Sequence, residues 1–164
     1  MATIGSAGTA KTNQRLTTTT GVNASLAALT QGAAAVGTAP IGQVRAQNVA
    51  AELAERSTTV QYPAVNVYCE KIVNNLAEKF QTLSGSVQMA VEIRHSQDGL
   101  EGLEAAVELY ADAVMQTLDA SRGDWGDGMY YAGGYQTVFG AVKHGGRNFL
   151  QVAKVTFEIA VGVN

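Results

Sequence analysis

Four carboxylates recur at helical spacing in the middle of the chain, and they are the residues best placed to do chemistry. They are Glu101, Glu104, Glu108 and Asp112, which fall along one face of a helix. Grouped carboxylates can bind divalent cations, but no histidine lies within a turn of these four, so we expect no metal site. The stripe is then a solvated face, a face that meets a basic patch on another subunit, or the lining of a passage for DNA.

A glycine-rich stretch from Ser121 to Gly134 carries the large aromatic residues Trp125, Tyr130 and Tyr131. Its glycines are not spaced as in a phosphate-binding loop, and Gly-Asp-Trp-Gly-Asp-Gly lacks the remaining ligands of a calcium loop. We therefore expect a loop without a cofactor. Large aromatic side chains on a loop either pack back on the core or contact a partner, and the sequence leaves both alternatives open.

The most basic part of the chain is a short predicted turn that contains Lys143, His144 and Arg147. We expect a solvated tip or a salt-bridging contact there, with phosphate contact as the alternative. Neither His144 nor His95 has a nearby set of residues for nucleophilic catalysis, and the chain has no Gly-x-Ser-x-Gly turn and no cysteine cluster. The single cysteine, Cys69, is expected to be a small buried hydrophobe. We therefore expect no enzymatic activity and no cofactor.

Length and composition favour a folded globular protein. The chain has 164 residues, of which 46% are hydrophobic and 15% are charged, and its formal net charge is −3. A general nucleic-acid-binding protein is usually strongly basic, so this class is disfavoured. No apolar run reaches the roughly 18 residues of a membrane-spanning helix, and no secretory signal is visible. We expect a protein that folds in a reducing cytoplasm and has no membrane partner.

Four segments have the two-residue period of strands that are buried on one face. They are residues 62–69, 87–94, 135–142 and 149–161. Between the second and the third lies a predicted helix, residues 98–118, with an apolar stripe that includes Leu100 and a capping box of Asp98 and Glu101. The order of these elements predicts an α+β fold, in which a four-stranded, mainly antiparallel sheet packs against one long helix.

The segments around these elements are less strongly patterned. Residues 1–21 are rich in Ala, Thr, Gly and Ser, so we expect a flexible N-terminal arm, or an arm that becomes ordered against a neighbouring subunit. Residues 22–164 then form a single α+β domain. Extra N-terminal helices are predicted at residues 26–33 and 43–56. Residues 70–81 fit either an amphipathic helix or an irregular excursion from the sheet.

The run Tyr62-Pro-Ala-Val-Asn-Val-Tyr68 resembles the aromatic-Pro-Ala-Val-x-Val-Tyr strand of the tail terminator proteins of long-tailed bacteriophages. In that family a Glu-containing strand, an acidic-capped helix and a C-terminal strand follow in the same order, and here they resemble residues 87–94, 98–118 and 152–158. The resemblance runs from about residue 43 to the C-terminus. The Ala/Thr-rich N-terminus and the glycine-rich Trp125 loop depart from the pattern. They leave open another neck protein, such as a head–tail joining or stopper factor.

The resemblance implies a virion structural protein that forms a ring, usually a hexamer. Such a ring caps the tail tube, stops its polymerisation and joins the tail to the head connector. The implied partners are further copies of the chain, the tail tube protein and the head connector or head completion protein, and genomic DNA passes through the ring without sequence-specific binding. The protein would be assembled in the host cytoplasm and located in the tail or neck of the virion. A small-ligand-binding or enzymatic α+β domain is the alternative.

A ring closes through head-to-tail contacts, so each subunit needs two different contact surfaces. The candidate surfaces are the aromatic glycine-rich loop, the basic turn, the acidic helix face and the N-terminal arm. The residues expected at these contacts are Trp125, Tyr130, Tyr131, Lys143, His144, Arg147, Glu101, Glu104, Glu108 and Asp112.

Overall fold

The computed structural model describes residues 3–30, 40–49, 61–145 and 148–164. Residues 50–56 of the predicted helix at 43–56, and Arg147 of the basic turn, lie outside the described residues. The helices are α1 (Ile4–Thr17), α2 (Val22–Thr30) and α4 (Leu103–Asp119). The strands are β1 (Gln43–Arg45), β2 (Ala64–Asn74), β3 (Leu83–Gln97), β4 (Gly123–Gly126), β5 (Met129–Tyr131), β6 (Gln136–Phe139), β7 (Lys143–Gly145) and β8 (Asn148–Val163).

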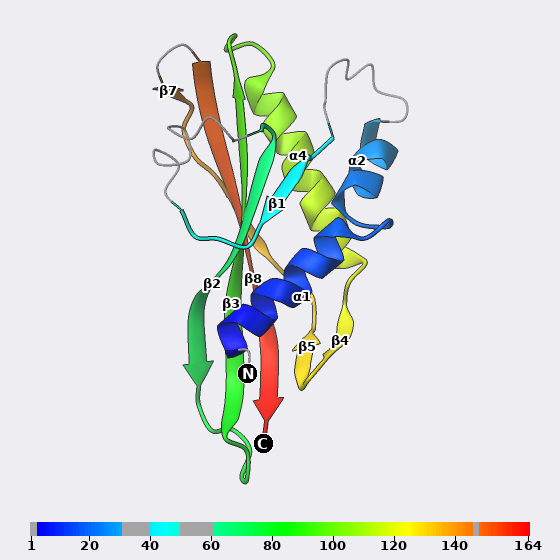
Figure 1. Ribbon diagram of the computed structural model, residues 1–164, viewed down its shortest axis with the longest axis vertical. Coiled ribbons are helices and arrows are strands. Elements are labelled where there is room, and N and C mark those ends of the chain that lie inside the picture. Colours follow the sequence, from blue (N-terminus) through cyan, green and yellow to red (C-terminus); the bar gives the residue numbers. More distant parts are fainter. Residues whose placement is uncertain (1–2, 31–39, 50–60, 146–147) are drawn as a thin grey trace.

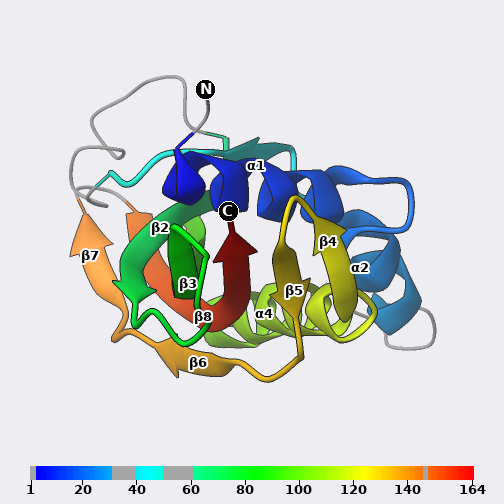
Figure 2. The ribbon, with the colours of Figure 1, turned by 90° about the horizontal axis from the view of Figure 1, so that it is seen from below.

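All the described strands belong to one mixed sheet (Figure 1). Its order is β1-β2-β3-β8-β5-β4, and the short strands β6 and β7 also pair with β8. Strand β1 runs parallel to β2, whereas the other pairs are antiparallel. The centre is the long β3–β8 pair, which extends from Leu83 opposite Val163 to Gln97 opposite Phe149. Seen from below, the sheet is curled, with α1 across one side of it (Figure 2).

The prediction of a four-stranded sheet packed against one long helix is therefore wrong, although the α+β class is right. The four predicted strands are present as β2, β3, β6 and β8. Four further strands were not predicted, namely β1, β4, β5 and β7, and each is only three or four residues long. Such short strands contain too few residues to show a two-residue period. Strand β1 pairs with the long strand β2, β5 and β7 pair with the long strand β8, and β4 pairs with β5.

The core lies between the sheet and the helices, on what we call the helix face of the sheet. Alternate residues of β3 point to this face and have no exposed surface, namely Val87, Met89, Val91 and Ile93. The apolar stripe of α4 packs on the same core, and its buried members are Leu103, Val107, Tyr110, Ala111, Ala113, Val114, Thr117 and Leu118. The opposite surface of β2, β3 and β8 is called the outer face below.

The start of α4 differs from the prediction. Its N-cap is Gly102 in the left-handed conformation, with φ of 81°, and no side chain caps the helix. The predicted capping box of Asp98 and Glu101 is not formed, and Leu100 is exposed instead of joining the apolar stripe. Because glycine adopts positive φ without steric cost, the chain can turn into the helix four residues later than the Asp98 signal indicates.

The predicted flexible arm contains helix α1. Thr3 caps the helix by accepting a hydrogen bond from the Ser6 backbone N–H, at 3.4 Å. Gly8, Thr12 and Leu16 form its buried face, at intervals of four residues. A Cβ atom at Gly8 would lie 3.1 Å from the Met89 sulfur, so the helix approaches β3 closely where a side chain is missing. The sequence pattern does not indicate that this face is buried, because only one of its three residues is a large hydrophobe.

Two further predictions near the N-terminal half need correction. Residues 43–45 are strand β1, where a helix was predicted, because they pair with β2 from Ala64 to Asn66. Residues 70–74 continue β2, and residues 75–82 form the connection to β3, so the helix predicted at 70–81 is absent. The alternative of an irregular excursion fits this connection. Helix α2 agrees with the helix predicted at 26–33, apart from its earlier start and the undescribed residues beyond Thr30.

Candidate functional site

The glycine-rich stretch is largely a hairpin made of β4 and β5 that packs on the core, and the prediction of a loop is wrong. Its turn residues Gly126, Asp127 and Gly128 all have positive φ. Trp125 is 5% exposed and Tyr131 is fully buried, and both rings contact Phe157 of β8. The indole N–H of Trp125 donates to the Ser121 carbonyl at 2.7 Å. These two aromatic residues stabilise the subunit from inside.

Helix α1 holds this hairpin from its other side. The Lys11 ammonium donates to the Trp125 carbonyl at 2.8 Å and forms an ion pair with Asp127 at 2.8 Å. The Arg15 guanidinium lies over the Trp125 ring, 5.3 Å from its centre. Of the three predicted aromatic contacts, only Tyr130 remains at the surface, with 53% of it exposed. Tyr130 is therefore the member of this set that is free to meet a partner.

The acidic stripe lies on the exposed side of α4 and on the turn before it. All four residues of the stripe are exposed, namely Glu101, Glu104, Glu108 and Asp112. Within the described residues, no group of three His, Cys, Asp or Glu side chains is arranged to hold a metal ion. The stripe remains a candidate contact surface.

The basic turn is partly a strand, which corrects the prediction. Residues 143–145 form β7 and pair with β8 from Leu150 to Asn148. Lys143 and His144 are exposed, and the His144 ring packs edge-on against Phe149, with centroids 5.0 Å apart. Arg147 lies outside the described residues. Lys143 and His144 therefore lie on the short strand β7, which pairs with β8.

The other residues with catalytic potential are held in packing contacts. The His95 ring packs edge-on against Tyr110 of α4, with centroids 5.4 Å apart, and burial lowers the pKa of its imidazole. Cys69 is half-buried, and burial raises the pKa of its thiol. A Cβ on Gly5 of α1 would lie 3.3 Å from the Cys69 sulfur, so the thiol faces the helix. A thiol with a raised pKa has little of the reactive thiolate form at neutral pH.

A polar network that the sequence did not reveal covers the outer face of the sheet. Its first part lies at a β-bulge in β2 between Cys69 and Lys71. The bulged residue Glu70 forms an ion pair with Lys154 of β8, two strands away, and accepts a hydrogen bond from Gln88 at 3.3 Å. Glu70 lies two residues after Tyr68, on the same face of β2, and the bulge leaves it without a residue opposite on β3. Its carboxylate reaches across β3 to β8.

The second part of the network lies further along the same strands. The Tyr68 hydroxyl donates to Glu92 at 2.6 Å, and the Arg94 guanidinium forms an ion pair with the same carboxylate at 2.7 Å. Arg94 also donates to the Val49 carbonyl, beyond β1. Burial, followed by the hydrogen bond to Glu92, raises the pKa of Tyr68 far above its usual value. Apart from the buried Arg94 Nε, which has no hydrogen-bond partner among the described residues, these groups satisfy one another. We interpret the network as a stabilised surface of the sheet.

The most exposed apolar residues lie at the connection between β2 and β3, residues 75–82, which we call the hairpin tip. Phe80 is 97% exposed and Leu76 is 63% exposed. Both have positive φ, 72° and 49° respectively, a conformation that bulky residues rarely adopt. The Asn74 side chain fixes the base of the tip by accepting hydrogen bonds from the backbone N–H groups of Leu76 and Ser84, at 3.3 and 3.0 Å.

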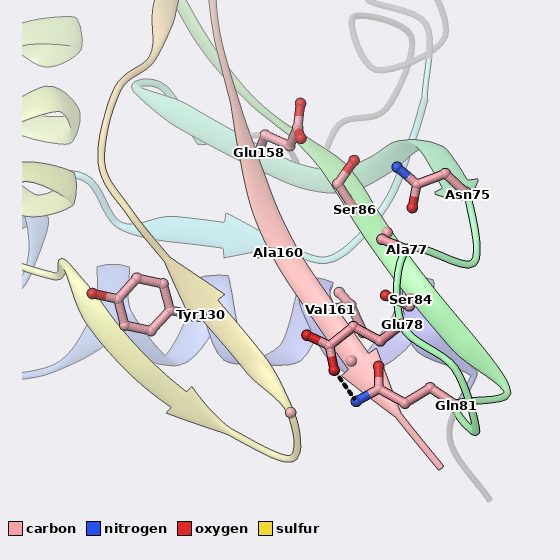
Figure 3. Close-up of a pocket in the computed structure, with 13 residues that line it drawn as sticks. Asn75, Ala77, Glu78, Gln81, Ser84, Ser86, Tyr130, Glu158, Ala160 and Val161 are labelled. Carbon is pink, nitrogen blue, oxygen red and sulfur yellow. Dashed lines mark hydrogen bonds between the residues drawn. The ribbon is translucent and has the colours of Figure 1, made fainter.

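Two grooves lie on the outer face of the sheet, and the first of them borders the hairpin tip. The first has a volume of about 380 Å³ and lies between the tip, β8 and β5. Figure 3 shows Glu78 and Gln81 of the tip on one side of β8 and Tyr130 on the other. The second groove has a volume of about 340 Å³ and lies over β3, β8 and the β5–β6 connection. We call it the β8 groove, and its lining residues are Gln88, Gly133, Gly134, Tyr135, Gln136, Thr156, Phe157 and Glu158.

The hairpin tip was not predicted, because Leu76 and Phe80 also fit the apolar stripe of an amphipathic helix. One signal was available: Asn74 and Asn75 interrupt the apolar pattern, and asparagine favours turns. The outer network had no such signal, because its members come from three strands. Their proximity depends on the register of β2, β3 and β8, which the sequence alone does not specify.

Comparison with protein-family models and with curated proteins gives no match for this chain. No helix among the described residues is long and apolar enough to cross a membrane.

Proposed function

We propose that this protein is a virion structural protein of the tail terminator type, which forms a ring that caps a phage tail tube and joins it to the head connector. The observation that carries the proposal is the hairpin tip, which holds Leu76 and Phe80 in water on a strained backbone. Strained, exposed apolar residues are typical of segments that act by contacting a partner. The resemblance of residues 62–68 to the terminator strand supports the same proposal.

A ring also requires a second, different contact surface, and the far side of β8 offers one. Val138 and Phe139 of β6 are exposed, and they lie beside Tyr135, which borders the β8 groove. The hairpin tip and this β6 surface differ in sequence and in structure, as a head-to-tail contact requires. The candidate contacts at Tyr130, Lys143, His144 and the acidic stripe of α4 remain available for the tail tube and the head connector.

A tube-growth assay tests this proposal directly. Purified protein is added to the tail tube protein encoded in the same genome while that protein polymerises, and tube lengths are measured by electron microscopy. A terminator caps tube ends, so sub-stoichiometric amounts should shorten the tubes and leave ring-shaped density at one end. Unchanged tube lengths with no end-bound density would contradict the proposal. Binding to the head connector without any effect on tubes would favour a stopper or joining factor.

A further inference from the structure

We propose that the hairpin tip of one copy docks into the β8 groove of the next copy, with the Phe80 ring inside the groove and Lys79 against Glu158. This inference rests on the proposed function, since it assigns the contact that closes the ring. The partner is a second copy of this chain.

The tip is built to present Phe80 outward. Thr82 donates its backbone N–H to the Val163 carbonyl at 2.9 Å, which ties the end of the tip to β8. Gly85 leaves no space for a side chain, because a Cβ there would lie 1.9 Å from the Val73 carbonyl oxygen. The base of the tip is thus fixed on both strands, while the Phe80 side chain makes almost no contact with its own subunit. Fixing an apolar anchor in its projecting position lowers the entropy cost of docking.

The β8 groove can receive an aromatic ring. Its volume of about 340 Å³ exceeds that of one phenylalanine side chain, and Gly133 and Gly134 form part of its wall. A Cβ atom on Gly134 would meet nothing within 4 Å. Tyr135 borders the groove, and its hydroxyl donates to Asp119 at 3.2 Å, which holds the ring in place. An aromatic ring docked beside Tyr135 would gain an aromatic contact.

The charges beside the two surfaces are complementary. Lys79 directly precedes Phe80 at the tip, whereas Glu158 is exposed and lines the β8 groove. Among the described residues, neither Lys79 nor Glu158 has an ion-pair partner within its own subunit. Glu78, the other charged residue of the tip, is turned towards Gln81, whose amide donates to it at 3.5 Å (Figure 3). The tip therefore presents an apolar ring and a positive charge to a groove that carries a negative charge.

Self-association of the purified chain tests the apolar part of this contact. Phe80→Ser removes the anchor and Thr156→Trp fills the groove, and each should weaken association by about 30-fold, as the loss of a hot spot does. Leu100→Ser is the control, since Leu100 is also an exposed apolar residue, at 56% compared with 97% for Phe80, but lies before α4. Sedimentation velocity over a concentration series gives the dissociation constants, and circular dichroism verifies that each variant is folded. Association of Phe80→Ser equal to that of the parent would overturn the proposal.

A charge exchange tests the identity of the partner. Lys79→Glu and Glu158→Lys should each weaken association, whereas the chain that carries both substitutions should recover it, because each tip again meets an opposite charge on the next copy. If the double variant is as weak as the single ones, Lys79 does not meet Glu158 and the proposal fails. A parent chain that stays monomeric at every concentration also overturns it. Tube capping by such a monomer would leave the proposed function standing, so the two failures are distinguishable.

Discussion

Trp125 illustrates at the scale of a single residue how context decides the role of an aromatic side chain. In the sequence it stands among glycines, where a core position and a partner contact are equally plausible. In the structure it packs between Tyr131, Phe157 and Arg15. Its neighbour Tyr130 points to the other side of the same short hairpin and is exposed. The alternation of a strand therefore separates a core residue from a candidate contact residue.

Replacing Trp125 should cost a large part of the stability of the subunit. Trp125→Ala should lower the free energy of unfolding by about 3–5 kcal/mol, because it leaves a cavity beside two other aromatic rings. Tyr130→Ala, one strand away, should change it by less than about 1 kcal/mol, because Tyr130 is half-exposed. Urea denaturation of both variants measures the difference. Equal stability of the two variants would show that Trp125 is not part of the core.

Tyr131 should make the stability of the protein depend on alkaline pH. Burial, with a smaller contribution from Asp119, raises the pKa of its phenol from 10.0 to about 12. The unfolded chain then loses this proton at lower pH than the folded chain. The contribution is complete below pH 10 and is lost as the pH rises to about 12, and it amounts to about 2–3 kcal/mol. The free energy of unfolding, measured by denaturation at several pH values across this range, should fall less steeply with pH for Tyr131→Phe than for the parent. An identical pH dependence of parent and variant would contradict the assignment.

Much of the residue-scale pattern was still predictable. The alternation of Val87, Met89, Val91 and Ile93 correctly indicated which face of β3 is buried. Phe80 was not predictable, because its spacing from Leu76 is the same in an amphipathic helix and in an exposed turn. Whether an apolar residue is buried depends on what packs over it, and a single segment of sequence does not contain that information.

At the scale of elements, long periodic segments were predictable and short ones were not. The strands β3 and β8 and helix α4 each have enough residues to repeat their pattern several times. The β4–β5 hairpin escaped detection, although Asp127-Gly128 is a recognised signal for a two-residue hairpin turn. Gly128 is needed there, since a Cβ atom would lie 2.1 Å from the Gly162 carbonyl oxygen. Helix α1 escaped because its buried face is made of small residues.

The close packing of α1 on β3 can be tested with one substitution. Gly8→Leu raises helix propensity but places a side chain against Met89 and Val87, so α1 should detach from the sheet. Trypsin should then cleave at Lys11 and Arg15 much faster than in the parent. Ala10→Leu is the matched control, because Ala10 lies on the exposed side of the same helix. If the parent is cleaved as fast as Gly8→Leu, the N-terminal segment is mobile in the isolated subunit.

At the scale of the whole molecule, the fold places its candidate contacts on different sides. The hairpin tip projects beyond the lower end of β8, whereas α4 runs along the upper half of the molecule (Figure 1). The class of fold was predictable because two strongly patterned strands come before the long helix and two come after it, an order typical of an α+β fold. The curled sheet was not, since its curvature and its extra strands arise from pairings between segments far apart in the chain. The tip and the β8 groove arise from the same long-range pairings.

The position of α4 leads to a prediction about DNA. If the ring closes through the hairpin tip and the β8 groove, the acidic stripe is not used between copies and can line the central passage. Carboxylates there would repel the phosphate backbone and let DNA slide without being retained. The triple variant Glu104→Lys, Glu108→Lys and Asp112→Lys changes the formal net charge from −3 to +3, since each substitution adds two positive charges. It should still form rings, and these rings should bind DNA with strong salt dependence.

The location of the stripe can be read from the topology of the DNA that is retained. Preformed, cross-linked rings of the lysine variant should retain linear duplex DNA, which can thread through them, but not covalently closed circular DNA, which cannot. The control variant Glu104→Gln, Glu108→Gln and Asp112→Asn removes the negative charges without adding positive ones, so it should retain neither. Equal binding of linear and circular DNA by the lysine variant would place the stripe on the outside of the ring, where it would face the tail tube or the head connector.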